Sequence, residues 1–293
     1  MSAEENMPVE ESAAYFLGYE SASLEDALFS IIPAPYEGAS TYVRGQAAAP
    51  WSILAASGQI ENYDEESSLS LVDMGIHVND PALAPLEEGV LRDWTRDRIW
   101  DAIDATTVPV ILGGDGTVSL WGIEALLEHK DKKGNYDIEG LTVLHIDGNA
   151  DLNEPDEDDE GNLLENNHTV MRRVLELDRK VMAICQVGIR AMSRAAFNCI
   201  TDDDTPVETF FMSDLERMST ENWHDDVVNC LSTPVYLSID LNGLDPSVIP
   251  SVSNPEPGGL HWWSLLRLLK KVVARRRIAA FDITELCPKE GLI

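Results

Sequence analysis

The chain has 293 residues, of which 44% are hydrophobic, and its 52 acidic and 21 basic side chains give a net charge of -31. The apolar content is sufficient for a large core, and the length suits a single domain with a parallel α/β fold. The negative charge repels phosphate backbones and anionic lipids, which excludes nucleic acid and membrane surfaces as partners. No apolar run reaches the ~18 residues that a membrane-spanning helix requires.

Cysteine usage and the N-terminal residues predict the compartment. The four cysteines show neither CxxC nor CxxH spacing, so we expect no disulfides and no structural zinc site. Residues 1–12, MSAEENMPVEES, are acidic and contain no apolar stretch, which is not typical of a signal peptide. We therefore expect a cytoplasmic protein.

Short and mostly continuous apolar runs recur along the chain and predict strands that are buried on both faces. They are residues 28–32, 69–73, 108–112, 141–147, 181–188, 207–212, 235–240 and 278–283. Helical spacing lies between them, at 90–104, 118–129, 169–177 and 260–273. This alternation predicts a three-layer α/β/α fold with an eight-stranded, largely parallel sheet. No linker interrupts it, so we expect one domain over residues 1–293, with a poorly ordered or extended segment at 1–25.

The least regular internal stretch is 152–167, which contains the acidic run EPDEDDEGNLLEN. Acidic residues at this density do not form a core element, and we interpret the segment as a solvated surface loop. Because it directly follows a candidate site, gating of a ligand is the alternative interpretation.

Polar motifs follow four of the predicted strands. They are GGDGT at 113–117, HIDGNAD at 145–151, SIDLNGLDP at 238–246 and FDITELCP at 281–288. Ligands of parallel α/β sheets bind beyond the carboxyl ends of the strands, so these motifs share one rim. Any single aspartate there could cap a helix or support a loop. Asp147, Asp151 and Asp240 have no basic residue within their motifs, and such converging carboxylates require a cation or shared protons.

The series GGDG, HIDGNAD, SIDLNGLDP, NPEPGGL and ITELCP resembles the ureohydrolase (arginase/agmatinase) series GGDH, HxDAHxD, SxDxDxxDP, TPEPGGL and a DxxExxP-like end. YEGASTYVRGQAAAPWSILAAS resembles the family's substrate-entry and first-helix segment, LVDMG its second strand, and QVGIR the strand after the active-site loop. The resemblance implies the arginase-like fold. It also implies hydrolysis of guanidino or related amidino groups by a hydroxide between two Mn²⁺ ions.

The resemblance transfers six metal-ligand positions to this chain. Three keep their carboxylates, namely Asp147, Asp151 and Asp240. The other three lose their ligands: Gly116 and Asn149 replace histidines, and Asn242 replaces an aspartate. Glycine offers no ligand and asparagine only a neutral oxygen. We therefore expect either no metal or one weakly bound divalent cation (Mn²⁺, Mg²⁺ or Ca²⁺), and we do not expect the binuclear manganese centre of the family.

Three further residues match substrate-binding positions of the family. His168, in NNHTVMRR, aligns with a histidine that shuttles protons near the substrate, although the glycine of that motif is absent. Glu285 aligns with the acid that contacts the guanidinium, and Glu256 lies in the PEPGGL turn. The alternatives are a helix-start residue for His168 and a structural acid for Glu285.

These losses lead to two functional hypotheses. The first is a catalytically impaired homologue, a pseudoenzyme that acts as a regulatory or structural subunit or binds a guanidino or amine ligand. The alternative is an active, agmatinase-like hydrolase of C–N bonds in linear amidines, with an altered or single-metal site. The resemblance also implies a homo-oligomer, a trimer or a hexamer, and a hetero-oligomer with an active paralogue is the other expected assembly.

Overall fold

The computed structural model describes residues 15–38, 42–155, 166–177, 179, 181–218 and 223–288. Its centre is an eight-stranded sheet in the order β10-β9-β8-β11-β12-β7-β3-β6, in which each strand pairs in parallel with its neighbours. The strands are β3 (Phe29–Ala34), β6 (Ile76–Val78), β7 (Val108–Gly113), β8 (Thr142–Ile146), β9 (Ala183–Ile189), β10 (Val207–Phe211), β11 (Val235–Asp240) and β12 (Ile278–Thr284). The predicted fold class is confirmed.

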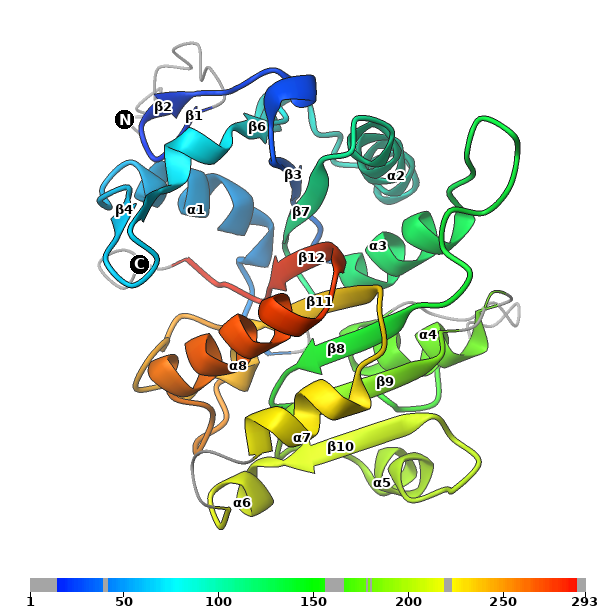
Figure 1. The fold of residues 1–293 in the computed structure, drawn as a ribbon. Helices are drawn as coiled ribbons and strands as arrows, with labels where there is room; N and C mark the ends of the chain where they lie inside the picture. Colours follow the sequence, from blue (N-terminus) through cyan, green and yellow to red (C-terminus); the bar gives the residue numbers. More distant parts are fainter. Residues whose placement is uncertain are drawn as a thin grey trace, which may run out of the picture.

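Helices cover both faces of this sheet (Figure 1). One face packs against α2 (Glu88–Asp104), α3 (Thr117–Glu128), α4 (Val170–Glu176) and α5 (Arg194–Ile200). The other packs against α1 (Ala49–Ser57), α6 (Met212–Leu215), α7 (Trp223–Cys230) and α8 (Trp262–Arg275). The described part also contains two small hairpins and several 3-10 turns. The hairpins pair β1 (Tyr15–Phe16) with β2 (Tyr19–Glu20), and β4 (Tyr63–Asp64) with β5 (Leu69–Ser70). Those turns are Leu24–Asp26, Gln46–Ala48, Leu71–Met74, Pro81–Leu83, Asn167–Thr169 and Leu241–Gly243.

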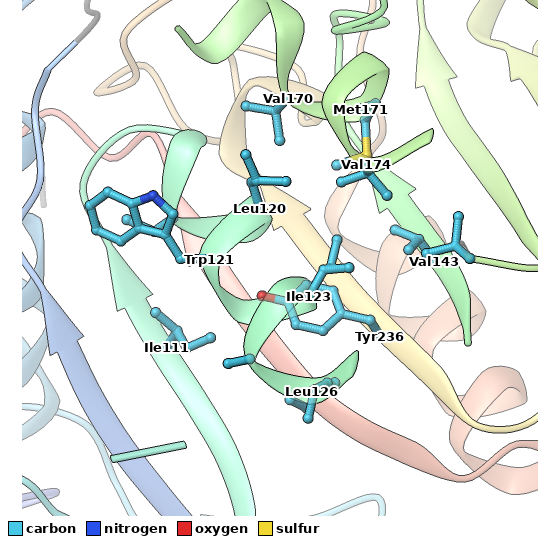
Figure 2. Close-up of a cluster of buried hydrophobic side chains, with 14 of the residues drawn as sticks. Ile111, Leu120, Trp121, Ile123, Leu126, Val143, Val170, Met171, Val174 and Tyr236 are labelled. Carbon is cyan, nitrogen blue, oxygen red and sulfur yellow. The ribbon is translucent and has the colours of Figure 1, made fainter. Parts of the chain in front are cut away.

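The largest apolar cluster lies between α3 and the central strands (Figure 2). Trp121 is 2% exposed, and its ring packs against that of Tyr36 with the ring centroids 4.8 Å apart. Tyr236 is fully buried and donates a hydrogen bond from its hydroxyl to Asp282 Oδ2 at 2.6 Å. This cluster fixes α3, whose N-terminal end reaches the rim of the sheet where the polar motifs lie.

The structure corrects one element prediction. Residues 69–73 do not form a sheet strand, since only Leu69–Ser70 is extended and Leu71–Met74 is a 3-10 turn. The sheet strand is the later β6, a three-residue edge strand that leaves too short a pattern to detect. In the segment 1–25, which we expected to be poorly ordered or extended, Tyr15–Phe16 and Tyr19–Glu20 form the β1–β2 hairpin, and residues 1–14 lie outside the described part. Residues 156–165 of the acidic stretch also lie outside it. None of the described helices is long and apolar enough to cross a membrane.

Candidate cation and substrate site

The loop after β7 is fixed against the end of β3 by close backbone contact. A Cβ atom on Gly114 would lie 1.8 Å from the carbonyl oxygen of Tyr36, so only glycine fits there. Asp115 then donates its N–H to the same carbonyl, and its carboxylate accepts hydrogen bonds from the backbone N–H groups of Gly38 and Thr117, both at 2.9 Å. These contacts place Gly116 at the start of α3, next to the ends of β11 and β12.

Three buried aspartates meet beyond the ends of β8 and β11. Asp147 is 0%, Asp240 5% and Asp151 8% exposed. Neither carboxylate oxygen of Asp147 accepts a well-aligned hydrogen bond from a described residue, although His145 Nε2 lies 3.4 Å from Oδ2 and a protonated Asp151 carboxyl is close enough to donate to Asp147. His145, Asp147 and Asp151 each offer one ligand atom, all within 4.8 Å of one another. The carboxylates of Asp147 and Asp151 are therefore close enough to share one cation; the group does not include Asp240, and His145 could be a ligand only through a ring nitrogen that carries no proton.

The protonation of these carboxylates reflects their crowding. Burial, followed by the charges of Asp147 and Glu285, raises the pKa of Asp151 well above its ordinary value. Burial and the same two neighbours also raise the pKa of Asp240. Charged carboxylates are unfavourable in this volume unless positive charge or protons compensate them. The space between these carboxylates therefore favours the binding of a cation.

Glu285 lies at the end of β12 with its side chain fully buried. Its Oε1 accepts a hydrogen bond from the backbone N–H of Gly116 at 2.7 Å, and its Oε2 accepts one from the Ser253 hydroxyl and one from Gln46 Nε2 at 3.3 Å. Burial is the main cause that raises its pKa to about 7, and the nearby Asp115 carboxylate acts in the same direction. A group with this pKa can change its protonation near neutral pH.

In the absence of divalent cations, stability is expected to fall as the pH rises through the titration of Glu285. The folded-state pKa of about 7 lies above the ordinary value of 4.5, so the folded protein binds more protons between these values, and raising the pH removes that stabilisation. Between pH 4.5 and pH 8 the wild type should lose about 3 kcal/mol more of its free energy of unfolding than Glu285→Gln. Urea unfolding in EDTA measures both losses, and equal losses would contradict the shift. Asp151 and Asp240 are present in both proteins, but the Glu285 charge contributes to their raised pKa values, so the difference measures Glu285 together with its coupling to these two aspartates.

Two residues not assigned from sequence support Asp147. Gln186, paired with His145 in the β8–β9 register, directs its Nε2 to the Ala150 carbonyl at 2.7 Å and to His145 Nδ1 at 3.1 Å. With an amide N–H donating to Nδ1, the neutral imidazole carries its proton on Nε2, which faces Asp147. His145 lies two residues before Asp147 at the end of one strand, and this period-two spacing was the signal that could have identified it.

Of the residues predicted to bind substrate, His168 lies beside the aspartates, whereas Glu256 lies in a loop that Arg190 holds through its backbone. His168 lies on the 3-10 turn before α4, with its side chain 32% exposed and Nδ1 3.9 Å from Asp151 Oδ1. Glu256 is half-buried, and its carbonyl oxygen accepts a hydrogen bond from Arg190 Nη2 at 2.6 Å. The same Arg190 nitrogen reaches the carbonyl of Asn242 at 2.8 Å, so this arginine joins the loop after β11 to the PEPGGL turn.

The positions of the three absent ligands do not fit the binuclear centre. A Cβ atom on Gly116 would lie 3.7 Å from Glu285 Oε1 and 3.8 Å from Asp240 Oδ2, so there is space for a side chain but no donor. The side-chain oxygens of Asn149 and Asn242 both accept hydrogen bonds from Asn254. The buried Asp147 carboxylate, in contrast, fits a single cation.

Comparison with known proteins agrees with this architecture. The arginase family model matches residues 27–291. The N(1)-aminopropylagmatine ureohydrolase of Synechocystis sp. is 30% identical over 278 residues, which cover 92% of this chain and 85% of that protein. The agmatine ureohydrolase structure of Thermoplasma volcanium superposes with a TM-score of 0.75 at 24% identity, covering 92% of this chain and 86% of that one. Proclavaminate amidino hydrolase from Streptomyces clavuligerus gives a TM-score of 0.78 at 22% identity, with coverages of 95% and 90%.

The chain therefore belongs to the arginase family, and its relatives are agmatinase-like ureohydrolases. The family resemblance stated from the motifs is confirmed.

Proposed function

We propose that the chain hydrolyses the guanidino group of a linear amine with the help of one divalent cation, held by Asp147, Asp151 and Asp240. The carboxylate of Asp147 carries the proposal, because it is 0% exposed and accepts no hydrogen bond from the described residues. His145 Nε2, 3.4 Å from Oδ2, and the charge of Arg190 compensate this buried carboxylate only in part, and a bound cation would complete the compensation. Oxygen donors of this kind suit Mn²⁺, Mg²⁺ or Ca²⁺.

A cation at this position would supply positive charge that polarises water or the substrate. The side chains around it have distinct tasks. His168 is partly exposed beside Asp151, so its imidazole can exchange protons with solvent and deliver one to the leaving amine. Glu285 and Asp240 place negative charge where a guanidinium or ammonium group would bind, and the net charge of -31 attracts cationic substrates to the protein.

The comparisons support a linear substrate. The Synechocystis and Thermoplasma relatives are named for aminopropylagmatine and agmatine, which carry a guanidino group and an amine on one unbranched chain. We extend this substrate class, a linear guanidino compound with a second cationic group, to the present chain.

The test combines a metal count with a product assay. Protein stripped with EDTA is incubated with Mn²⁺, desalted and analysed by plasma mass spectrometry, and urea release is measured from agmatine, aminopropylagmatine and guanidinobutyrate. We expect one ion per chain and urea release that is lost in Asp147→Ala. Asp203→Asn, a change at an exposed acid, is the control and should leave both readouts unchanged. A metal-free protein that releases no urea from any of the compounds would refute the proposal.

The second candidate is the catalytically impaired homologue that binds a guanidino or amine ligand without hydrolysing it. Its specific support is the absence of a histidine or an anionic side chain at Gly116, Asn149 and Asn242. Calorimetry with the same compounds distinguishes the two candidates, because this one requires heat of binding without urea release. We propose the same assembly for both, a trimer or hexamer or a mixed oligomer with an active paralogue, which light scattering during size-exclusion chromatography would test.

A further inference from the structure

The three positions without metal ligands are joined by one hydrogen-bond network. Asn254 connects two of them: its Nδ2 donates to Asn149 Oδ1 at 3.3 Å, and its backbone N–H donates to Asn242 Oδ1 at 3.1 Å. Asn149 follows β8, Asn242 follows β11, and Asn254 comes from the loop before the PEPGGL turn. Neutral amides therefore bond to one another where the resemblance implies the ligands of a second ion.

The directions of the two hydrogen bonds of the Asn242 side chain determine which amino acid fits at position 242. A backbone N–H can only donate, so the atom of Asn242 that faces Asn254 must be the oxygen. The Nδ2 of Asn242 then faces Ser253 Oγ at 3.3 Å and donates to it. Ser253 has a single hydroxyl proton, which it donates to the Glu285 carboxylate. An aspartate at 242 would place an acceptor against Ser253 and interrupt this order.

The network ends at Gly116. Glu285 accepts the hydrogen bond from the Gly116 N–H through Oε1, so the carboxylate that receives the Ser253 proton also holds the first residue of the α3 region. A Cβ atom on Gly116 would lie 3.7 Å from Glu285 Oε1, an ordinary contact distance, so the hydrogen bond uses the backbone of this position and not the absence of its side chain. The loops after β7, β8, β11 and β12 are thus connected through side chains of the described residues.

We propose that this network, Asn149–Asn254–Asn242–Ser253–Glu285–Gly116, is a metal-independent brace that holds the site loops together in place of a second cation. Asn254 is its central positioning residue. The brace does not depend on whether a cation binds at Asp147, so it can be tested separately from the proposed hydrolysis.

The first test is hydrogen exchange and thermal unfolding in EDTA at pH 8. The backbone amide of Asn254 should be protected at least ~10-fold in metal-free wild-type protein and lose this protection in Asn242→Ala. Asn242→Asp, which removes only the Nδ2 donor and adds charge, should lower Tm by about 2–6 °C. Asn198→Asp, the same substitution at an exposed position of α5, is the matched control. Rapid exchange at Asn254 in metal-free wild type, or equal Tm values for the two aspartate variants, would overturn the brace.

The second test needs no comparison of stability. In the triple variant Gly116→His/Asn149→His/Asn242→Asp, Asn254 still occupies the hydrogen-bonding position next to residue 149. Adding Asn254→Ala should therefore increase the Mn²⁺ content after desalting. The same Mn²⁺ content with and without this fourth change would show that Asn254 does not hold the ligand positions, and would overturn its assigned role.

Discussion

Asp147→Asn is expected to weaken Mn²⁺ binding while it stabilises the metal-free protein. The wild-type carboxylate is fully buried and accepts no well-aligned hydrogen bond from the described residues, so without a cation its charge depends on His145 and Arg190. Removing that charge should weaken Mn²⁺ binding by about 100-fold or more. In EDTA at pH 8 the free energy of unfolding should rise by about 1–3 kcal/mol, because a buried charge that the protein compensates incompletely is replaced by a neutral amide.

Calorimetric titration with Mn²⁺ and urea unfolding in EDTA measure these two effects. Asp203→Asn carries the same change of charge on the surface and should alter neither quantity appreciably. A less stable Asp147→Asn protein in EDTA would mean that the carboxylate has a favourable partner in the folded chain. Unchanged Mn²⁺ affinity would place the cation elsewhere.

Trp121→Ala is expected to produce the largest loss of stability, about 3–5 kcal/mol, because truncating a buried aromatic side chain leaves a cavity. Trp121 is 2% exposed and packs against Tyr36, whose carbonyl oxygen accepts the hydrogen bond from Asp115 N–H. The same change should therefore loosen the loop that holds Gly116. Urea unfolding measures the loss. Trp262→Ala, at a tryptophan that is 49% exposed, should change the free energy of unfolding by less than about 0.5 kcal/mol. Equal effects of the two substitutions would contradict the assigned core.

Seven of the eight predicted sheet strands correspond to strands of the observed sheet, because central parallel strands are apolar on both faces and give long, continuous signals. The strand that we predicted at 69–73 is wrong because the signal there is short and misleading. An apolar run there forms a 3-10 turn, while the edge strand Ile76–Val78 has only three residues and a polar centre at His77. The short helices α5 and α7 were also missed, since seven or eight residues give barely two turns of periodicity.

The sequence was sufficient to predict where the acidic residues of the site lie, but not which hydrogen bonds connect the residues around them. Position at strand ends was sufficient to bring Asp147, Asp151 and Asp240 to one rim, and the structure places them there. Their metal-binding role stays a prediction. The part played by Asn254 could not be predicted, because it depends on the approach of two loops that are about a hundred residues apart in sequence, as the bond to Asn149 shows.

The position of β12 in the sheet has a consequence for biosynthesis. This last strand lies between β11 and β7, so it joins the β3, β6 and β7 part of the sheet to the β8–β11 part. Until residue 284 has left the ribosome, the nascent chain holds two partial sheets whose inner edges have unpaired backbone groups, and such edges are prone to wrong pairing. Glu285 follows directly on that strand. The candidate site, to which Glu285 contributes, therefore cannot be complete before the sheet has closed.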